Sequence, residues 1–209
     1  MIKSERVYTS KYNGKLFIQM DGKHKLLDSA TVNYSYGSVQ RIWRSGLSKL
    51  NIYDLNNVLL LGLGGGSVVN ILKEELGYEG KLTAVELDPV MMDIAAQEYG
   101  MKSSRKLKIV CADAATFIEN DKQKYDLIIT DVFIGSKLPA FVKRKDFWIH
   151  LHHRLSDHGL AIVNWSLTST NELALERLIS REKSRFKVRV RRKVAGSNTL
   201  LFAEKLPGI

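Results

Sequence analysis

The chain has 209 residues and a formal net charge of +10, with 44% hydrophobic and 26% charged residues. This is an ordinary globular composition, and the length fits one domain with a small appendage. The single cysteine, Cys111, excludes an internal disulfide, and we expect a buried thiol in a reducing, cytoplasmic protein. No apolar run reaches membrane-spanning length and no signal peptide is evident, so we expect no membrane association. The positive charge favours an anionic partner.

The first thirty residues predict a small antiparallel β-meander. Short β-type runs lie at residues 7–9, 15–20 and 25–27. Asn13-Gly14 and Asp21-Gly22 separate these runs, and both dipeptides are preferred in tight hairpin turns because they tolerate positive φ. A helix from about Tyr36 to Leu47 is expected next. We assign residues 1–46 to this hairpin region with its linking helix, and residues 47–209 to the main domain.

From Asn57 onward, short apolar strands alternate with helical patterns. Strands are expected near residues 58–61, 82–85, 107–110, 127–129, 160–163, 186–190 and 199–203. We expect Asp157-His158-Gly159 to end a helix that carries Phe147, Leu151 and Leu155. Repeated units of this kind predict an α/β fold with a mostly parallel seven-stranded sheet and helices on both faces. Ligands bind beyond the carboxyl ends of such strands.

A glycine-rich turn follows the first strand of the main domain, in the order Gly62-Leu63-Gly64-Gly65-Gly66-Ser67. Glycine permits a tight turn and lets a ligand approach the backbone, and the following helix offers free N–H groups. A tight strand-to-helix turn alone would also explain these glycines. The third glycine of the dinucleotide pattern would fall on Ser67, which favours an adenosyl sulfonium over NAD.

Acidic residues end the next three strands. Glu86 lies about twenty residues after the glycines, where a carboxylate can accept hydrogen bonds from ribose hydroxyls. Asp113 can accept from an adenine amino group, and Asp131 lies within reach of the reactive end of the ligand. Each acid alone could instead cap a helix. Together they predict a nucleoside site.

These motifs resemble a known family. Val58–Ile71, Ala84–Ala95 and Ile109–Ile118 resemble motifs of class I S-adenosylmethionine-dependent methyltransferases. The stretch Tyr125–Phe133, with Pro139, Phe147 and the Gly159 turn after it, is similar to spermidine synthases. The resemblance implies a Rossmann-like class I methyltransferase fold preceded by a β-meander, and a homodimer. It also implies S-adenosylmethionine, its decarboxylated form or methylthioadenosine as the ligand.

The departures from spermidine synthases concern the aminopropyl chemistry. Those enzymes carry an aspartate where this chain has Gly65, and a second aspartate, which deprotonates the attacking amine, where it has Ile134. Their acidic pair before a helical tyrosine has no counterpart here, although Tyr36 matches the tyrosine. Aminopropyl transfer joins two cations and needs negative charge to offset their repulsion. We therefore expect methyl transfer to an unknown small-molecule acceptor, with true aminopropyl transfer as the alternative.

The residues expected to bind the cofactor come from the glycine turn and the strand ends. They are Gly62, Gly64, Gly65, Gly66, Glu86, Leu87, Asp113, Ala114 and Asp131. Asp131 and Tyr36 are the catalytic candidates. The alternatives are that Asp131 receives backbone N–H bonds in the loop below it and that Tyr36 is a core aromatic. No metal site is expected, because only His150 and His153 share a helical face and zinc needs three or four ligands.

The basic segment from Arg181 to Lys193 has an alternating pattern. In residues 187–191, the cations Lys187, Arg189 and Arg191 alternate with valines, which is typical of a half-exposed edge strand. The alternative is a stripe facing nucleic acid, which would make the protein an RNA or DNA methyltransferase. A non-catalytic nucleoside-binding protein is a further rival.

Overall fold

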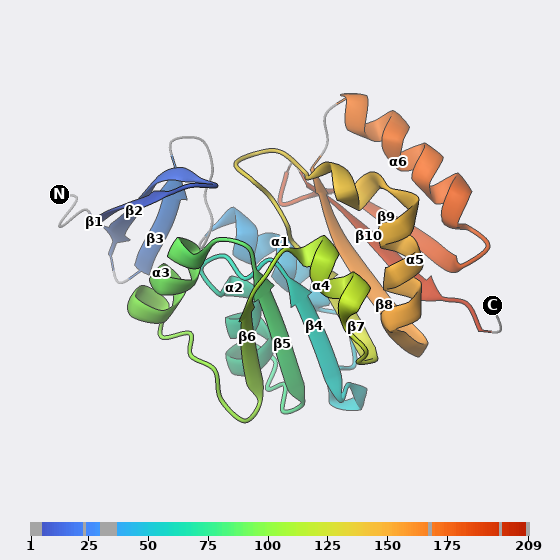
Figure 1. Ribbon diagram of the computed structural model, residues 1–209, viewed down its shortest axis with the longest axis horizontal. Helices are drawn as coiled ribbons and strands as arrows, with labels where there is room; N and C mark the ends of the chain where they lie inside the picture. The colour runs from blue at the N-terminus through green and yellow to red at the C-terminus, as the bar shows by residue number, and fades with distance from the viewer. Residues whose placement is uncertain (1–5, 23, 30–36, 167–168, 197, 208–209) are drawn as a thin grey trace.

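The computed structural model describes residues 6–22, 24–29, 37–166, 169–196 and 198–207, which form two sheets (Figure 1). The smaller sheet is the predicted meander. Its strands are β1 (Arg6–Ser10), β2 (Gly14–Asp21) and β3 (His24–Ser29), in antiparallel order β1-β2-β3. Gly14 and Gly22 adopt φ of 66° and 60°, as the predicted turns require.

The larger sheet has seven strands in the order β6-β5-β4-β7-β8-β10-β9. The strands are β4 (Asn57–Leu61), β5 (Lys81–Glu86), β6 (Leu107–Cys111), β7 (Tyr125–Thr130), β8 (Leu155–Ser166), β9 (Phe186–Val194) and β10 (Asn198–Lys205). Strand β10 runs antiparallel to both of its neighbours, while β6, β5, β4, β7 and β8 pair in parallel. The predicted mostly parallel, seven-stranded fold is confirmed.

Helices cover both faces of this sheet (Figure 1). They are α1 (Ser38–Leu47), α2 (Ser67–Asn70) continued by the π-helical turn η2 (Ile71–Glu75), α3 (Pro89–Tyr99), α4 (Ala114–Asn120), α5 (Lys145–Arg154) and α6 (Ser169–Glu182), with short 3₁₀ turns at η1 (Ile52–Asp54) and η3 (Ala140–Lys143). Successive strand residues face opposite sides. Leu60 packs in the core under α1 and α2, and Leu59 packs in the core under α4, α5 and α6.

The small sheet is fixed to α3 by an apolar contact and a buried ionic one. Leu16 and Leu27 pack against Ile94. The side chain of Glu98 is fully buried and accepts hydrogen bonds from Arg6, Tyr8 and Lys25. Burial alone would raise the pKa of Glu98, but these bonds and the two cations lower it below its ordinary value.

Two local expectations are wrong. Cys111 is exposed rather than buried, because it is the last residue of β6, which forms an edge of the sheet. Helix α5 ends at Arg154, before the segment 157–159, and Leu155 already pairs with Tyr125 as the first residue of β8. His158 adopts a φ of 61°, and the register against β7 shifts here. The segment 157–159 therefore forms an irregularity inside a strand.

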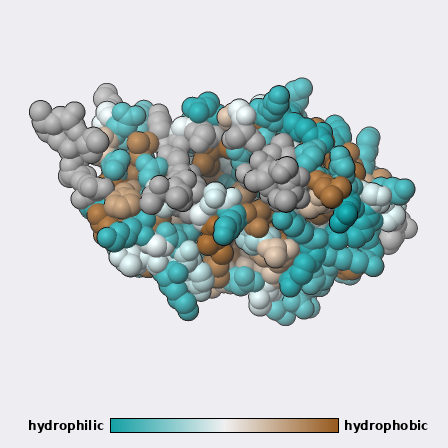
Figure 2. Space-filling model, turned by 90° about the horizontal axis from the view of Figure 1, so that it is seen from above, coloured by the Kyte–Doolittle hydropathy of each residue, from teal (hydrophilic) through white to brown (hydrophobic). Residues whose placement is uncertain are grey.

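Large hydrophobic side chains at the surface are dispersed. In the view from above, they appear in small groups between hydrophilic side chains (Figure 2). The exposed ones among the described residues are Val7, Tyr12, Tyr53, Ile134 and Leu173, which come from different parts of the chain. Such single exposures are normal for a globular protein. No helix in the part of the chain that the structure describes is long and apolar enough to cross a membrane.

Candidate functional site

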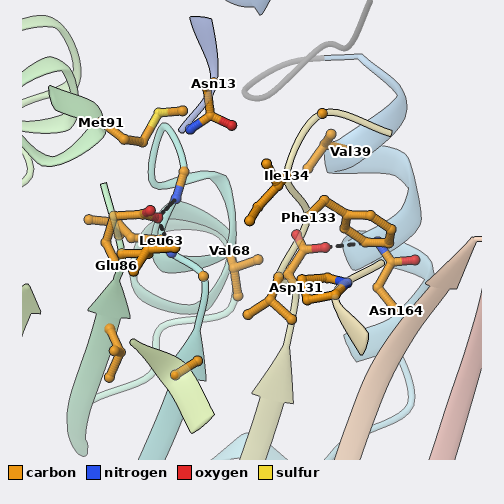
Figure 3. A pocket seen from close by; sticks show the side chains of 18 of the residues that line it. Asn13, Val39, Leu63, Val68, Glu86, Met91, Asp131, Phe133, Ile134 and Asn164 are labelled. Carbon is orange, nitrogen blue, oxygen red and sulfur yellow. Dashed lines mark hydrogen bonds between the residues drawn. The ribbon is translucent and has the colours of Figure 1, made fainter. Parts of the chain in front are cut away.

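A cavity of about 400 Å³ lies beyond the carboxyl ends of the central strands (Figure 3). Strands β4, β5, β6, β7 and β8 each contribute a residue within two positions of their carboxyl ends: Gly62, Glu86, Asp113, Asp131 and Asn164. The turn between β1 and β2 adds Asn13 from the other side. The predicted convergence of three carboxylates is confirmed, although each is held by a different set of hydrogen bonds.

The cavity is acidic in a basic chain. Glu86, Asp113 and Asp131 line it, and no lysine, arginine or histidine is among the described residues of its wall. The chain as a whole carries a formal net charge of +10. Unpaired charges are costly in a partly enclosed site. The cavity therefore suits a cationic or neutral ligand better than an anionic one.

The glycine turn brings the backbone to the edge of the cavity. Gly62 has a φ of 94°, and a Cβ there would lie 2.3 Å from the carbonyl oxygen of Asp131. Gly64 has a φ of 53° and also lines the cavity. Gly66 backs onto Met101, and neither Gly65 nor Gly66 is among the described lining residues. Ligand contact by Gly65 and Gly66 stays a prediction.

The backbone of the glycine turn fixes Glu86. Its Oε2 accepts hydrogen bonds from the N–H groups of Leu63 and Gly64 at 3.1 and 3.0 Å (Figure 3). Its Oε1 accepts a hydrogen bond from the backbone N–H of Asp88 at 3.0 Å. Burial raises the pKa of Glu86 above its ordinary value, although these bonds oppose the rise. A carboxylate has about four acceptor positions. Three are used by the protein, which leaves room for one strong hydrogen bond to a ligand.

Asp113 has a structural contact and remains open to the cavity. It is the exposed N-cap of α4, where Oδ1 accepts the N–H of Thr116 at 2.9 Å. The capping alternative is therefore correct, but it uses only one carboxylate oxygen and leaves Oδ2 for a ligand. Leu87 and Ala114, the other predicted contacts of this region, also line the cavity.

Asp131 is held by side chains from distant segments. Trp43 of α1 donates its indole N–H to Oδ2 at 2.7 Å, and Asn164 of β8 donates its amide to Oδ1 at 2.8 Å. Burial raises the pKa of Asp131, and these two bonds oppose the rise. The expected alternative, a carboxylate held by backbone N–H groups, is wrong because both of these donors are side chains.

An amide pair extends this network. Asn198 of β10 donates to Oδ1 of Asn164 at 2.9 Å, so the Asn164 amide accepts from one residue and donates to Asp131. Both asparagines line the cavity. Neither these asparagines nor Trp43 was among the site residues expected from the sequence. The position of Asn164 near the end of a predicted strand was a usable signal, whereas nothing local marked Trp43 or Asn198.

The wall beside Asp131 is apolar. Val39 and Ile42 of α1 contribute to it, together with residues of the loop after β7 and of η3: Val132, Phe133, Ile134, Pro139 and Phe141. Ile134, where the resemblance would place the second aspartate of spermidine synthases, is 42% exposed. Tyr36, the other catalytic candidate, lies outside the described residues.

The β1–β2 turn is tied to the segment that carries Glu86. Asn13 donates its side-chain amide to Oδ2 of Asp88 at 2.8 Å, and the Ser10 hydroxyl donates to the same oxygen. Asp88 also caps α3 through the N–H of Val90 at 3.0 Å. Because the backbone of Asp88 donates to Glu86, the small sheet and the strand end are held as one unit.

The basic strand lies away from the cavity wall. Strand β9 is the other edge of the large sheet, where Lys187 and Arg189 are exposed and Val188 and Val190 are half-buried. Arg191 donates to the carbonyl oxygen of Ser45 at 2.6 Å. The predicted half-exposed edge strand is confirmed. No residue of β9 is among the described residues that line the cavity.

The three histidines in the segment 150–153 do not form a uniformly exposed surface. His152 is 4% exposed and packs on Phe186, with ring centroids 5.5 Å apart, whereas His153 is exposed. Burial lowers the pKa of His152. Within the described ranges, no group of three or more histidine, cysteine or acidic side chains is placed to hold a metal ion.

The sheet order, the glycine turn and the strand-end acids define the class. The chain has the fold of S-adenosylmethionine-dependent methyltransferases, and this fold is similar to that of spermidine synthases. The "Methyltransferase domain" family model matches residues 58–145, which include the turn and all three acids.

Individual proteins similar to this chain have two kinds of activity in their names. A polyamine aminopropyltransferase of Vibrio vulnificus is 33% identical over 137 residues, covering 63% of this chain and 46% of that protein. An eEF1A lysine and N-terminal methyltransferase homolog of Drosophila melanogaster is 34% identical over 118 residues, covering 52% of this chain and 17% of that protein. The chain thus spans less than half the length of either relative.

A solved structure extends the likeness over the whole fold. The crystal structure of a probable spermidine synthase from Corynebacterium glutamicum superposes with a TM-score of 0.78 at 19% identity, covering 98% of this chain and 81% of that one. This match includes the small N-terminal sheet. At this level of identity it concerns the fold alone.

Proposed function

We propose that the protein is a methyltransferase that binds S-adenosylmethionine in the acidic cavity and transfers its methyl group to an acceptor beside Asp131. The single observation that carries this proposal is the charge of the cavity wall: three carboxylates and no cation among the described lining residues. The sulfonium of S-adenosylmethionine is positive and gains from such a wall. The pyrophosphate of NAD would bring negative charge without a cationic partner.

In this proposal, each strand end contacts a different part of the ligand. Glu86 accepts a hydrogen bond from one ribose hydroxyl at its remaining acceptor position, and Oδ2 of Asp113 accepts from the adenine amino group. Gly62 and Gly64 let the ligand lie against the backbone. Asp131 then faces the sulfonium and the transferred group. Methyl transfer from an activated sulfonium depends mainly on alignment and desolvation, so a sparse catalytic set is sufficient.

The test is a calorimetric titration with S-adenosylmethionine, its decarboxylated form, methylthioadenosine and NAD. We expect binding of the adenosyl sulfur compounds and none of NAD at the same concentrations. Tighter binding of the carboxylated than of the decarboxylated sulfonium supports methyl transfer. Binding of NAD, or of none of the four, would contradict the proposal.

Aminopropyl transfer is the second candidate, favoured by the similarity to the Vibrio vulnificus protein. It would have to proceed without the acids that spermidine synthases carry at the positions of Gly65 and Ile134. Incubation with putrescine and decarboxylated S-adenosylmethionine, followed by detection of spermidine, decides it. We also propose that the protein is cytoplasmic and forms a homodimer. Light scattering, which measures molar mass, would test the oligomeric state.

A nucleic-acid methyltransferase is less well supported. Its basic stripe would be β9, which does not reach the cavity wall among the described residues. It predicts binding of RNA or DNA that weakens steeply with salt. A non-catalytic nucleoside-binding protein predicts ligand binding without turnover of any acceptor.

A further inference from the structure

The two ends of the cavity differ in charge. Glu86 and Asp113 belong to the ends of β5 and β6, where the glycine turn and the start of α4 hold them. Asp131, at the end of β7, is the single carboxylate of the β7–β8 end among the described lining residues. The β7–β8 end therefore offers one negative charge.

Within the described part of the chain, no cationic side chain pairs with Asp131. The two side chains that donate to Asp131, Trp43 and Asn164, are both neutral. Glu98 provides a contrast within the same molecule, because Arg6 and Lys25 pair with it directly. A partly enclosed carboxylate without a cation favours a ligand that brings one.

The rest of the wall at the β7–β8 end suits the hydrocarbon part of a ligand better than a second charged group. Apart from the neutral polar residues Ser136, Asn164 and Asn198, the side chains that line this end are aliphatic or aromatic, namely Val39, Ile42, Val132, Phe133, Ile134 and Phe141. Burying methylene groups against such a wall is favourable. A second ammonium group placed there would lose water without gaining a charged partner among the described lining residues.

We infer that the acceptor is an alkyl amine with one positive charge. Its nitrogen meets Asp131, and its carbon chain packs against the apolar wall around Ile134. This inference rests on the proposed function and narrows it to a substrate class. A diamine would place its second ammonium among those apolar side chains.

The transfer itself balances as follows. The ammonium first releases a proton to solvent water, because only the neutral amine has a lone pair for attack. The nitrogen then forms a bond to the methyl carbon while the carbon–sulfur bond breaks and its electron pair stays on sulfur. The products are a methylated ammonium and the neutral thioether, so the positive charge moves from sulfur to nitrogen. In this step Asp131 orients the amine by accepting one of its N–H bonds.

The test compares hexylamine with 1,6-diaminohexane, which differ by one terminal ammonium. Each is titrated by calorimetry into the protein saturated with S-adenosylhomocysteine, whose own binding is measured first. We expect hexylamine to bind at least about tenfold more tightly, equivalent to about 1.4 kcal/mol. Equal or tighter binding of the diamine would overturn the inference, and so would binding of neither amine. Failure of the thioether to bind would instead overturn the proposed function.

Variants of two residues sharpen the result. Asp131→Asn should weaken hexylamine at least about tenfold in protein saturated with the thioether, since the variant removes the carboxylate that accepts from the amine. Ile134→Asp adds an acid to the apolar wall and should reverse the preference in favour of the diamine. Ile134→Asn, a neutral polar control of the same size, should not reverse it. Unchanged hexylamine binding in Asp131→Asn, or reversal by both Ile134 variants, would contradict the inference.

One further ligand identifies the source of the amine. Nα-acetyl-lysine amide has the same single ammonium on a butyl chain, flanked by peptide groups. Binding within about threefold of hexylamine assigns the site to an amine on a polypeptide, and binding more than about tenfold weaker assigns it to a free small molecule. Either result is read only if hexylamine itself binds.

Discussion

The two ends of the cavity are built in different ways. At the β5–β6 end, Glu86 is held by N–H groups of its own strand end and of the glycine turn, and Asp113 by the first turn of α4. At the β7–β8 end, Asp131 is held by Trp43, 88 residues away in sequence, and by Asn164, 33 residues away. Local backbone groups therefore position the carboxylates of the β5–β6 end, whereas side chains from distant segments position Asp131 at the β7–β8 end.

This difference distinguishes the part of the cavity that the fold itself creates from the part that side-chain substitutions can change. A nucleoside site made of backbone turns and strand ends accompanies the fold itself, because the turn and the caps form wherever the strands do. A site made of side chains from α1, β8 and β10 can change without disturbing the sheet. We therefore propose that the β5–β6 end binds the nucleoside of the cofactor and that the β7–β8 end, which its sulfur faces, selects the acceptor.

The largest effect is expected where the two ends touch. Gly62→Ala places a Cβ 2.3 Å from the carbonyl oxygen of Asp131 and keeps a φ of 94°. The strained φ costs about 1–3 kcal/mol and the overlap about as much again. We expect urea unfolding to show a loss of about 3–5 kcal/mol in the free energy of unfolding, or no folded protein.

The control for this change is Gly100→Ala. Gly100 has a φ of 69° at the end of α3, and a Cβ there meets nothing within 4 Å. It should cost about 1–2 kcal/mol. Equal losses in the two variants would show that close approach at Gly62 is unimportant.

Glu86→Gln should separate the two ends. The variant loses the carboxylate that accepts from the glycine turn and, in our proposal, from the ribose. A hydrogen bond to a charged group contributes about 1.5–3 kcal/mol, so S-adenosylhomocysteine affinity should fall roughly 10- to 150-fold by calorimetry. Glu74→Gln, an exposed position on η2, is the matched control and should leave affinity unchanged. If Glu86→Gln bound S-adenosylhomocysteine as tightly as the wild type, the proposed hydrogen bond between Glu86 and the ribose would be wrong.

Trp43→Phe should affect the β7–β8 end alone. It removes one of the two donors to Asp131 and leaves a buried acceptor unpaired, at a cost of about 1–3 kcal/mol in unfolding free energy. Trp148→Phe is the matched control, because this equally buried indole donates to the carbonyl oxygen of Val142 at 2.8 Å. Both variants should lose stability, and only Trp43→Phe should weaken hexylamine binding. Weakening by both would indicate a general loss of packing.

The smallest effect is a pH dependence of opposite sign at two buried carboxylates. The pKa of Asp131 is raised by burial, so the folded protein holds that proton more tightly than the unfolded chain. The stability of the wild type relative to Asp131→Asn is therefore greatest at low pH and declines as the pH rises through the folded pKa. Urea unfolding at a series of pH values measures this difference.

Glu98 should show the reverse. Its pKa is lowered despite burial, because Tyr8, Lys25 and Arg6 stabilise the ionised form. The stability of the wild type relative to Glu98→Gln should be fully present above the ordinary carboxyl pKa and decline as the pH falls through the lowered folded value. The same sign for both residues would contradict the difference in their surroundings.

The sequence predicted what depends on neighbours along the chain. Apolar runs located all seven strands of the large sheet, and the glycine turn, Glu86 and Asp113 were expected at the cavity because each lies at a strand end or within two residues of one. The contacts of Asp131 could not be predicted, since Trp43 belongs to a helix that reaches it only after the sheet has assembled. The exposure of Cys111 was missed for a similar reason, because its apolar neighbours do not reveal that β6 is an edge strand.

The central claim is that one nucleoside sulfonium lies across both ends of this cavity. A crystal structure with S-adenosylhomocysteine tests it most directly. We expect a ribose hydroxyl within hydrogen-bond distance of Glu86, the adenine beside Asp113, and the sulfur facing Asp131. A thioether bound elsewhere, or with its sulfur directed away from Asp131 into the β5–β6 end, would contradict the account.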